Sequence, residues 1–120
     1  MDLQNYVMGW AKEISGIAAV AIVNLDGTPV AGGSFDEDLD VMLPAAYFTE
    51  VVKSSRESFS VTNWGEFEDV LITSNTHYIV MRMVSEDIYF GAAVTVRKGN
   101  LGLLRLKMKM ATASILKFLR

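Results

Sequence analysis

Hydrophobic residues at the start of the chain recur at helical spacing. A stripe with intervals of four, three and four positions contains Leu3, Val7, Trp10 and Ile14. Such a stripe is typical of a helix that packs one face on a core. Ser15 and Gly16 follow, and glycine tolerates the left-handed conformation that often ends a helix. We therefore expect a first helix that stops at Ser15 and Gly16.

The next segment has the pattern of strands. Residues 17–23 are apolar on both alternating faces, which predicts a strand whose sheet is covered on both sides. Asp26 and Gly27 then favour a tight hairpin, because glycine supplies the positive φ angles of such turns. The return strand, at about 28–34, contains Pro29, which lacks the N–H group that a central strand needs. We therefore place this second strand at a sheet edge.

An acidic run precedes a second helical pattern. The run contains Asp36, Glu37, Asp38 and Asp40. Carboxylates at a helix start are favoured by the partial positive charge of its unpaired N–H groups, and we prefer this interpretation to a metal site. Pro44 fits the first turn of a helix but would disrupt its middle. The predicted second helix therefore covers about 41–58.

This second helix has more apolar surface than one core face needs. Its main stripe contains Val41, Ala45, Phe48, Val52 and Phe59. A neighbouring row, which we call the seam, contains Tyr47, Val51, Ser54 and Ser58. The seam has coiled-coil spacing, and its small residues would let another helix approach closely. We expect a partner helix at the seam; a loosely amphipathic surface is the alternative.

Three strands and a final helix complete the pattern. The segments 68–74, 77–84 and 88–96 are apolar and separated by short polar turns, which favours antiparallel hairpins. The final helix, at about 100–119, has a stripe of Leu101, Leu104, Met108, Ala111, Ile115, Phe118 and Leu119. A basic helix rich in Met and Leu can also lie on a membrane surface. This stripe is no wider than a core helix requires, so we expect core packing.

The predicted order of elements is αββαβββα. A five-stranded, mostly antiparallel sheet that is apolar on both faces needs helices on both faces. Three helices suffice if two cover one side and one covers the other. The sequence therefore predicts an α/β chain of the α+β type, with a single three-layer α/β/α domain over residues 1–120.

Composition narrows the class of protein further. The chain has 120 residues and a mass of 13.2 kDa, which is enough for one domain. Because the sequence contains no cysteine, disulfide scaffolds, zinc knuckles and thiol catalysis are excluded. No segment approaches the roughly 20 apolar residues of a membrane span, and the first residues do not resemble a signal peptide. We expect a cytoplasmic protein.

Charge is distributed unevenly along the chain. Residues 1–87 contain all 14 acidic residues and four basic ones, a balance of 4 − 14 = −10. Residues 88–120 contain seven basic residues and no acidic one, a balance of +7. Such asymmetry can indicate a nucleic-acid or membrane patch, or two elements of one fold or of two subunits that neutralise each other. We prefer neutralisation, because a pI of about 5.0 does not suit a dedicated nucleic-acid binder.

Residues that could carry out catalysis are few. His77 is the only histidine, and it lies at the start of a hairpin strand with no recognised nucleophile motif nearby. Gly32 and Gly33 do not form a dinucleotide fingerprint, and no phosphate-binding loop occurs. The acidic run lacks the remaining ligands of a calcium loop. We therefore expect no enzymatic activity, no cofactor and no metal.

The sequence offers surfaces for association instead. The strand with Val70, Leu71 and Ile72 has no proline and is expected at an unprotected edge. A two-fold dimer could pair this edge with its copy and the second helix with its copy. The expected interface contains Tyr47, Val51, Ser54, Ser58, Val70, Leu71 and Ile72. Trp64, and with it Phe48, is a candidate partner contact because interface hot spots favour Trp; capping of the core is the alternative for Trp64.

In its ordered combination of features the chain resembles the roadblock/LC7 family, which includes MglB-like regulators of Ras-like GTPases. The resemblance covers essentially the whole chain. It rests on Gly16 before an apolar strand, on Asp26-Gly27 and Val30-Ala31, on the three-strand block, and on the segment 99–105, Gly-Asn-Leu-Gly-Leu-Leu-Arg. It implies a profilin-like fold and a dimer with a sheet that continues across the two-fold axis and with paired second helices.

The resemblance also implies a function. Family members are platforms for small GTPases or modulators of their GTP hydrolysis, and some are light chains of the dynein motor. The leading hypothesis is therefore a non-enzymatic regulator or scaffold for a small Ras-like GTPase. A small-molecule sensor is the alternative, because folds of this general build host unrelated functions. An enzyme would require a cleft around His77.

Overall fold

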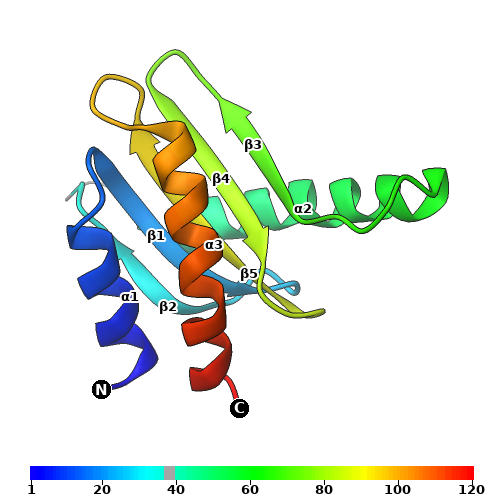
Figure 1. Ribbon diagram of the computed structural model, residues 1–120, viewed down its shortest axis with the longest axis horizontal. Helices are drawn as coiled ribbons and strands as arrows, with labels where there is room; N and C mark the ends of the chain where they lie inside the picture. The colour runs from blue at the N-terminus through cyan, green and yellow to red at the C-terminus, as the bar shows by residue number, and fades with distance from the viewer. Residues whose placement is uncertain (37–39) are drawn as a thin grey trace.

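The computed structural model of the chain describes residues 1–36 and 40–120, and its elements follow the predicted order (Figure 1). The helices are α1 (Leu3–Lys12), α2 (Met42–Thr62) and α3 (Leu101–Phe118). The strands are β1 (Ile17–Asn24), β2 (Pro29–Ser34), β3 (Asp69–Thr73), β4 (His77–Met83) and β5 (Ile88–Thr95). The predicted order αββαβββα is confirmed.

The five strands form one sheet in the order β2-β1-β5-β4-β3. Every pair of neighbours is antiparallel. The hairpin of β1 and β2 joins the three-strand block through the long pairing of β1 with β5. The two edges are therefore β2, which contains Pro29, and β3, which contains Val70, Leu71 and Ile72. Both edge positions agree with the sequence prediction.

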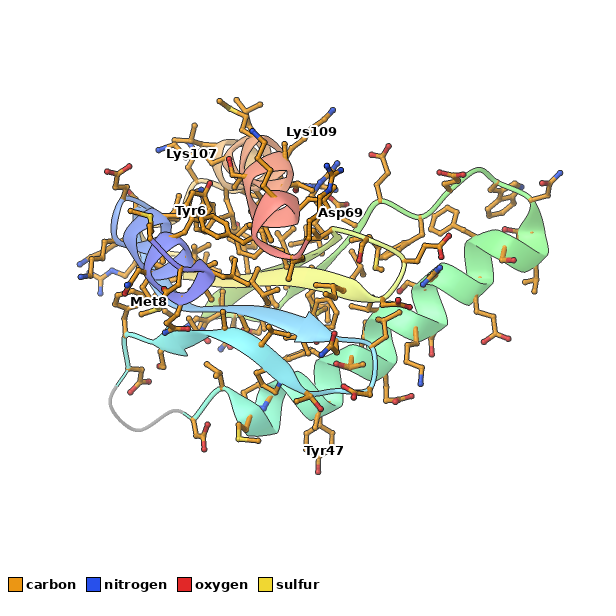
Figure 2. The ribbon with its side chains drawn as sticks, turned by 90° about the horizontal axis from the view of Figure 1, so that it is seen from below. Tyr6, Met8, Tyr47, Asp69, Lys107 and Lys109 are labelled. Carbon is orange, nitrogen blue, oxygen red and sulfur yellow. The ribbon has the colours of Figure 1, made fainter. Side chains whose placement is uncertain are left out.

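Helices cover both faces of this sheet (Figures 1 and 2). The helices α1 and α3 lie next to each other over one face, and α2 crosses the other. Successive strand side chains point to opposite faces. Within β1, for example, Val20 and Ile22 belong to the core under α1 and α3, whereas Val23 belongs to the core under α2. The predicted three-layer arrangement is confirmed.

The larger core lies between the sheet and the pair α1 and α3. From α3 it contains Leu104, Met108, Ala111 and Ile115, all buried. From α1 it contains Val7 and Ala11, and Trp10 packs edge-on against Phe90 with ring centroids 4.9 Å apart. Burial of these side chains supplies most of the driving force for folding on this face. The expected core stripe of α3 is therefore confirmed.

The smaller core lies between the sheet and α2. Its buried apolar residues are Val23, Ala45, Val52, Met81 and Tyr89. One buried polar contact crosses it: the Thr49 hydroxyl donates to the Ala45 carbonyl at 2.7 Å and lies 2.8 Å from the Tyr89 hydroxyl. Burial raises the pKa of Tyr89, because an ionised phenol would lose its hydration there. This contact fixes the position of α2 on the middle of the sheet.

Two helix ends differ from the prediction. The helix α1 ends at Lys12, and the positive φ of Gly16 belongs to the turn into β1. A Cβ on Gly16 would lie 2.9 Å from the Thr95 hydroxyl and 3.0 Å from the Gly99 nitrogen, so close packing also requires glycine there. The helix α2 continues one turn beyond residue 58, to Thr62, and ends on Asn63 in the left-handed conformation.

None of the helices in the described residues is long and apolar enough to cross a membrane.

The acidic run before α2 is described only in part. Glu37 and Asp38 lie outside the described residues. The Asp40 carboxylate accepts a hydrogen bond from the Met42 N–H at 3.0 Å, so this acid satisfies a free N–H group at the helix start. Pro44 lies in the first turn of α2, as its lack of an N–H group predicted.

The Thr49 contact gives a test of how α2 is held. Thr49 is 1% exposed, and Thr49→Val keeps its shape but leaves the Tyr89 hydroxyl only a 3.4 Å contact with the Ala45 carbonyl. We expect Thr49→Val to lower the free energy of unfolding by about 1–2 kcal/mol, because the buried Tyr89 hydroxyl loses its closer partner. Thr49→Ser, which keeps the hydroxyl, is the control for the lost bond. Urea unfolding followed by circular dichroism measures both; a Thr49→Val protein as stable as the wild type would contradict this role.

Candidate partner-binding surface

The two edges of the sheet differ in how their backbone groups are satisfied. At β2, the Gln4 side chain of α1 bonds to both backbone groups of Gly32: its amide N–H donates to the carbonyl at 3.0 Å, and its oxygen accepts from the N–H at 2.7 Å. The Gln4 amide thus takes the place of a neighbouring strand. Pro29 removes a further N–H from the same edge. The β2 edge is therefore blocked within the chain itself.

In the part of the chain that the structure describes, the β3 edge has no such cover. Its hydrogen bonds to β4 use Glu68 and Ser74 at either end, and an antiparallel ladder uses alternate residues. The outward backbone groups therefore belong to Asp69, Leu71 and Thr73. No hydrogen bond within residues 1–36 and 40–120 reaches them. This edge is open to pairing with another strand.

The side chains of β3 connect it to both cores. Val70 and Ile72 pack with the core under α2, and Leu71 packs with the core under α1 and α3. Asp69, on the same side as Leu71, forms ion pairs with Arg82 of β4 and Arg105 of α3. Bonding to Asp69 raises the pKa of the Arg105 guanidinium. The strand is thus held firmly although one of its edges is free.

The helix α2 is longer than the sheet that it covers. Its first half crosses the sheet, and its second half extends beyond β3 (Figure 1). Near the far end, Val61 and Trp64 are 75% and 77% exposed. Phe59 contacts Phe67 with ring centroids 6.1 Å apart and is still partly exposed. The core-capping interpretation of Trp64 is therefore wrong, because a side chain that is 77% exposed covers no core.

Charged and uncharged residues occupy different sides of α2. Glu50, Lys53 and Glu57 lie on one side, and Lys53 pairs with Glu50 at 3.7 Å. The opposite side has an uncharged row at intervals of four and three: Pro44, Phe48, Val51, Ser55, Ser58 and Thr62. The hydroxyls of Ser58 and Thr62 bond back to carbonyls of their own helix, at 2.8 and 2.7 Å. This row is small and uncharged enough for close approach of a second helix.

The expected seam is shifted slightly from this row. Val51 and Ser58 belong to both, and Val51 is half-buried against the core under α2. Tyr47 and Ser54 lie further round, on the face directed away from the sheet, and Tyr47 is 71% exposed (Figure 2). The seam therefore joins the uncharged row to an outer face of α2 that contains Tyr47, Ser54 and Val61.

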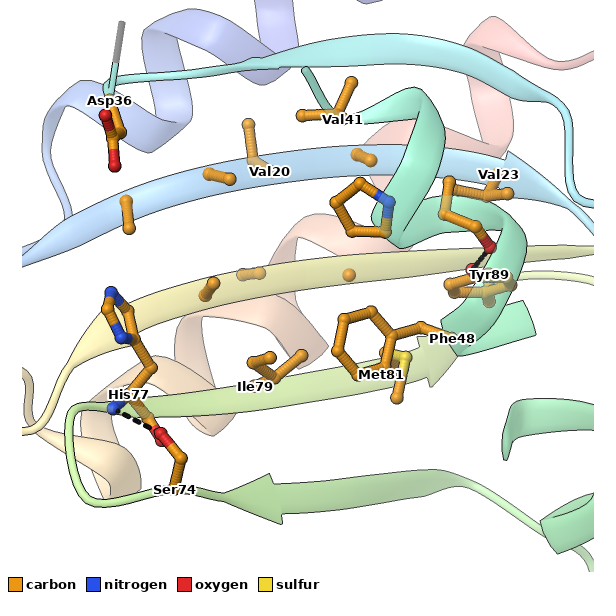
Figure 3. A pocket seen from close by; sticks show the side chains of 18 residues that line it. Val20, Val23, Asp36, Val41, Phe48, Ser74, His77, Ile79, Met81 and Tyr89 are labelled. Atoms are coloured by element: carbon orange, nitrogen blue, oxygen red, sulfur yellow. Dashed lines mark hydrogen bonds between the residues drawn. The ribbon is translucent and has the colours of Figure 1, made fainter. Parts of the chain in front are cut away.

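A cavity of about 410 Å³ opens beside the uncharged row, between the first half of α2 and the sheet (Figure 3). Pro44 and Phe48 of α2 form one wall, and Phe48 points into the cavity. The floor consists of small residues from β1 and β5: Ala19, Ala21, Gly91 and Ala93. Because these side chains are short, the sheet is left uncovered where a partner helix or a ligand could pack.

His77 lies at the polar end of this cavity, together with Asp36 and Ser74 (Figure 3). Its ring Nδ1 lies 2.8 Å from the Thr76 hydroxyl, and its backbone N–H donates to the Ser74 hydroxyl at 3.1 Å. No group of three or more His, Cys, Asp or Glu side chains in the described residues could hold a metal.

Sequence reasoning located part of this surface and missed part. It identified α2, the β3 edge and Trp64. It missed Val61, because the helix was expected to end before it, and it gave no role to Gln4, Ala19 or Ala21, whereas Gly91, Ala92 and Ala93 were recognised as leaving room for a neighbouring element. The alanines of residues 17–23 were visible as small residues in a strand, and that signal could have indicated an uncovered floor.

Comparison with solved structures finds the same fold. The roadblock/LC7 domain from Streptomyces avermitilis matches with a TM-score of 0.87 at 14% identity, over 99% of this chain and 98% of that one. MglB of Myxococcus xanthus matches with a TM-score of 0.86 at 17% identity, over 98% and 94%. MglC from Myxococcus xanthus matches with a TM-score of 0.67 at 20% identity, over 96% and 97%. The chain therefore has the roadblock/LC7 fold, as the resemblance predicted.

Comparison by sequence adds nothing to this result. No protein-family model matches the chain, and no curated protein matches it significantly.

The blocked β2 edge yields a second prediction. Gln4→Ala exposes both backbone groups of Gly32, so we expect a free energy of unfolding lower by about 1 kcal/mol and faster aggregation on warming. Asn5→Ala, at an exposed neighbouring position of α1, is the matched control. Light scattering during a thermal ramp follows aggregation, and urea unfolding gives the stability. If Gln4→Ala and Asn5→Ala behave alike, the Gln4 amide does not protect the edge.

Proposed function

We propose that the protein is a homodimeric regulator or scaffold for a small Ras-like GTPase and has no enzymatic activity of its own. The observation that carries the proposal is the combination of an open β3 edge with a long α2 that overhangs it. Within the described residues of a single chain, the outward backbone groups of β3 have no strand to pair with, and the second half of α2 has no sheet to cover. One two-fold axis at β3 would satisfy them together.

The dimer follows from the geometry of β3 and α2. Pairing β3 with its copy antiparallel would bond the outward groups of Asp69, Leu71 and Thr73, a set that is symmetric about Leu71. The two sheets would then be continuous, and the overhanging half of each α2 would lie over the sheet of the other protomer. There it would approach the cavity, which is the part of the sheet that its own α2 leaves uncovered.

The composition of the contact surfaces supports this arrangement. The uncharged row of α2 borders the cavity, so the two α2 helices would meet along Val51 and Ser58 with no charged residue between them. The charged side, with Glu50, Lys53 and Glu57, would stay in solvent. Apolar, uncharged surfaces associate readily because little hydration of charge is lost. In this dimer Phe48 would be covered by the partner.

The proposed role toward a GTPase is supported by structural similarity to other proteins and by the resemblance in the sequence. The chain shares its fold over nearly its full length with MglB and MglC, and one of the matching structures is described as MglB with a tetrameric arrangement. The resemblance in the sequence points to the MglB-like regulators of Ras-like GTPases. A dimer as described would present the outer faces of both α2 helices, with Tyr47 and Val61, and the exposed Trp64 as a two-fold platform.

The cavity also supports a second candidate function, a small-molecule sensor. Its volume of about 410 Å³ lies in the range of ligand pockets, and its apolar floor ends at the polar groups of Asp36, Ser74 and His77. A ligand would compete with the partner helix for the same floor. Native mass spectrometry distinguishes the two: a small molecule retained by a monomer favours the sensor.

Dimerisation is tested with two single substitutions to lysine, one on each side of α2. Val51→Lys puts a charge in the uncharged row while its aliphatic stem still covers the core, and we expect the mass measured by light scattering to fall to that of a monomer. Glu50→Lys, one residue away on the charged side, should leave the mass unchanged.

Thr73→Pro removes one outward N–H from β3 and should weaken the dimer by at least about tenfold, because the two-fold axis repeats the loss. A monomeric wild type at tens of micromolar would refute the dimer.

GTPase binding is tested with the small Ras-like GTPases encoded in the same genome, each loaded with GDP or with a non-hydrolysable GTP analogue. We expect one of them to bind with an affinity that depends on the nucleotide. Trp64→Ala should weaken that binding by about tenfold or more, as for a hot-spot residue. Met110→Ala, which changes an apolar residue that is 69% exposed on the opposite face, should not. Absence of binding to every such GTPase in both nucleotide states would overturn the function.

A further inference from the structure

The outer face of α3 has an exposed apolar ridge. We call Leu103, Leu106 and Met110 the α3 ridge; they are 46%, 53% and 69% exposed. Their spacing of three and four places them on one side of the helix, opposite the buried stripe with Leu104 and Met108. The ridge therefore contributes nothing to the core of the chain. Such a row of large apolar side chains at the surface indicates a contact with something outside the chain.

Lysines flank the ridge. Lys107 and Lys109 project from opposite flanks of α3 (Figure 2), and Lys117 continues the outer side toward the C-terminus. Residues 88–120 contain seven basic residues and no acidic one. Within the described residues, only Arg105 of these seven takes part in an ion pair, the one with Asp69. Within residues 1–36 and 40–120, the expected neutralisation inside the fold is therefore limited to this pair, and the surface around the ridge remains positively charged.

We propose that the α3 ridge is a peripheral binding site for an anionic phospholipid bilayer. Leu103, Leu106 and Met110 would enter the boundary between headgroups and acyl chains, and the flanking lysines would contact phosphate and carboxylate groups of the lipids. The apolar residues of the ridge match the acyl-chain boundary of such a bilayer, and the lysines on both sides of the ridge match its anionic headgroups. The helix stays packed on its own sheet throughout, so the contact requires no unfolding.

The flanking residues favour lipid over protein as the occupant. Protein interfaces are depleted in lysine and enriched in arginine and aromatic residues. Here the cations at the ridge are lysines, and the nearest arginine, Arg105, is already bonded to Asp69 of the β3 edge. The ridge itself contains no aromatic residue. Strongly hydrated, flexible ammonium groups suit a fluid layer of anionic headgroups, which needs no fixed geometry.

The architecture strengthens the contact if the proposed dimer forms. The helices α1 and α3 cover the face of the sheet opposite to α2. A two-fold axis at β3, normal to the sheet, would place both α3 ridges on the same side, so one flat bilayer could contact both. This doubling rests on the proposed dimer, whereas a single ridge binds on its own. Binding of the second ridge would be intramolecular, which raises the overall affinity.

Sedimentation with vesicles tests the site. Phosphatidylcholine vesicles with and without phosphatidylserine are mixed with the full chain at low and high ionic strength. We expect binding to the anionic vesicles only, with loss at high salt because the lysine contribution is screened. Lys109→Glu should weaken binding by about tenfold, since each lysine near an anionic surface contributes about fivefold and the reversal adds repulsion. Lys53→Glu, the same change on exposed α2, is the matched control.

The apolar part of the site needs its own variant. Leu106→Ser with Met110→Ser leaves every charge in place, and both positions are exposed, so the fold should be kept; circular dichroism checks this. We expect weaker binding to anionic vesicles with the salt dependence retained. Equal binding of the wild type to neutral and anionic vesicles, or equal effects of Lys109→Glu and Lys53→Glu, would overturn the proposal.

Other occupants would give different results. If the ridge variants lose the GTPase, or lower the mass of an assembly larger than a dimer, while the wild type ignores anionic vesicles, the ridge binds protein and the proposal is wrong. Failure of the proposed dimer or of the proposed GTPase binding can be distinguished from failure of the membrane site. Val51→Lys monomers should still bind anionic vesicles, more weakly than the dimer, and a protein that binds no GTPase should bind them unchanged.

Discussion

The structure depends on a sheet that is apolar on both faces but is covered completely on only one. Two helices, α1 and α3, lie over one face and bury its side chains in a large core. Among the described elements, the other face has only α2, which crosses the sheet and then extends beyond it. The hydrophobic effect favours covering what remains. The cavity over Ala19, Ala21, Gly91 and Ala93 and the overhanging end of α2 are two consequences of this one mismatch between sheet and helix.

Much of the fold follows from periodicity in the sequence. Alternating apolar residues define the strands, Pro29 assigns β2 to an edge, and the stripe from Leu104 to Ile115 places α3 on the core. The rest depends on contacts between distant residues. Gln4 has no local signal, because its bonds to Gly32 form only when α1 lies along β2. The far end of α2 was missed because its serines and threonines are weak helix formers, whereas their hydroxyls bond to carbonyls of the same helix.

The candidate surfaces were predictable to a smaller extent. The pattern identified Val51 and Ser58 as uncharged, but it did not specify which side of α2 would border the cavity, since that depends on how the helix is rotated on the sheet. Thr49 and Tyr89 fix that rotation through a buried contact between residues 40 positions apart. On α3 the ridge with Leu106 and Met110 was hidden among other Leu and Met residues. How α3 packs on the sheet alone decides which of its Leu and Met residues are buried and which are exposed.

The difference between the two sheet edges has a consequence for stoichiometry. Within the described residues, each molecule has a single sheet edge that can accept a strand, because on the other edge the Gln4 amide bonds to Gly32 and Pro29 lacks an N–H group. Two molecules joined at β3 would use up both accepting edges and leave a blocked β2 at each outer margin. Growth by backbone pairing would therefore terminate at two chains at any concentration, and a fibre could not propagate along the sheet. Any higher-order complex would have to be built through helices.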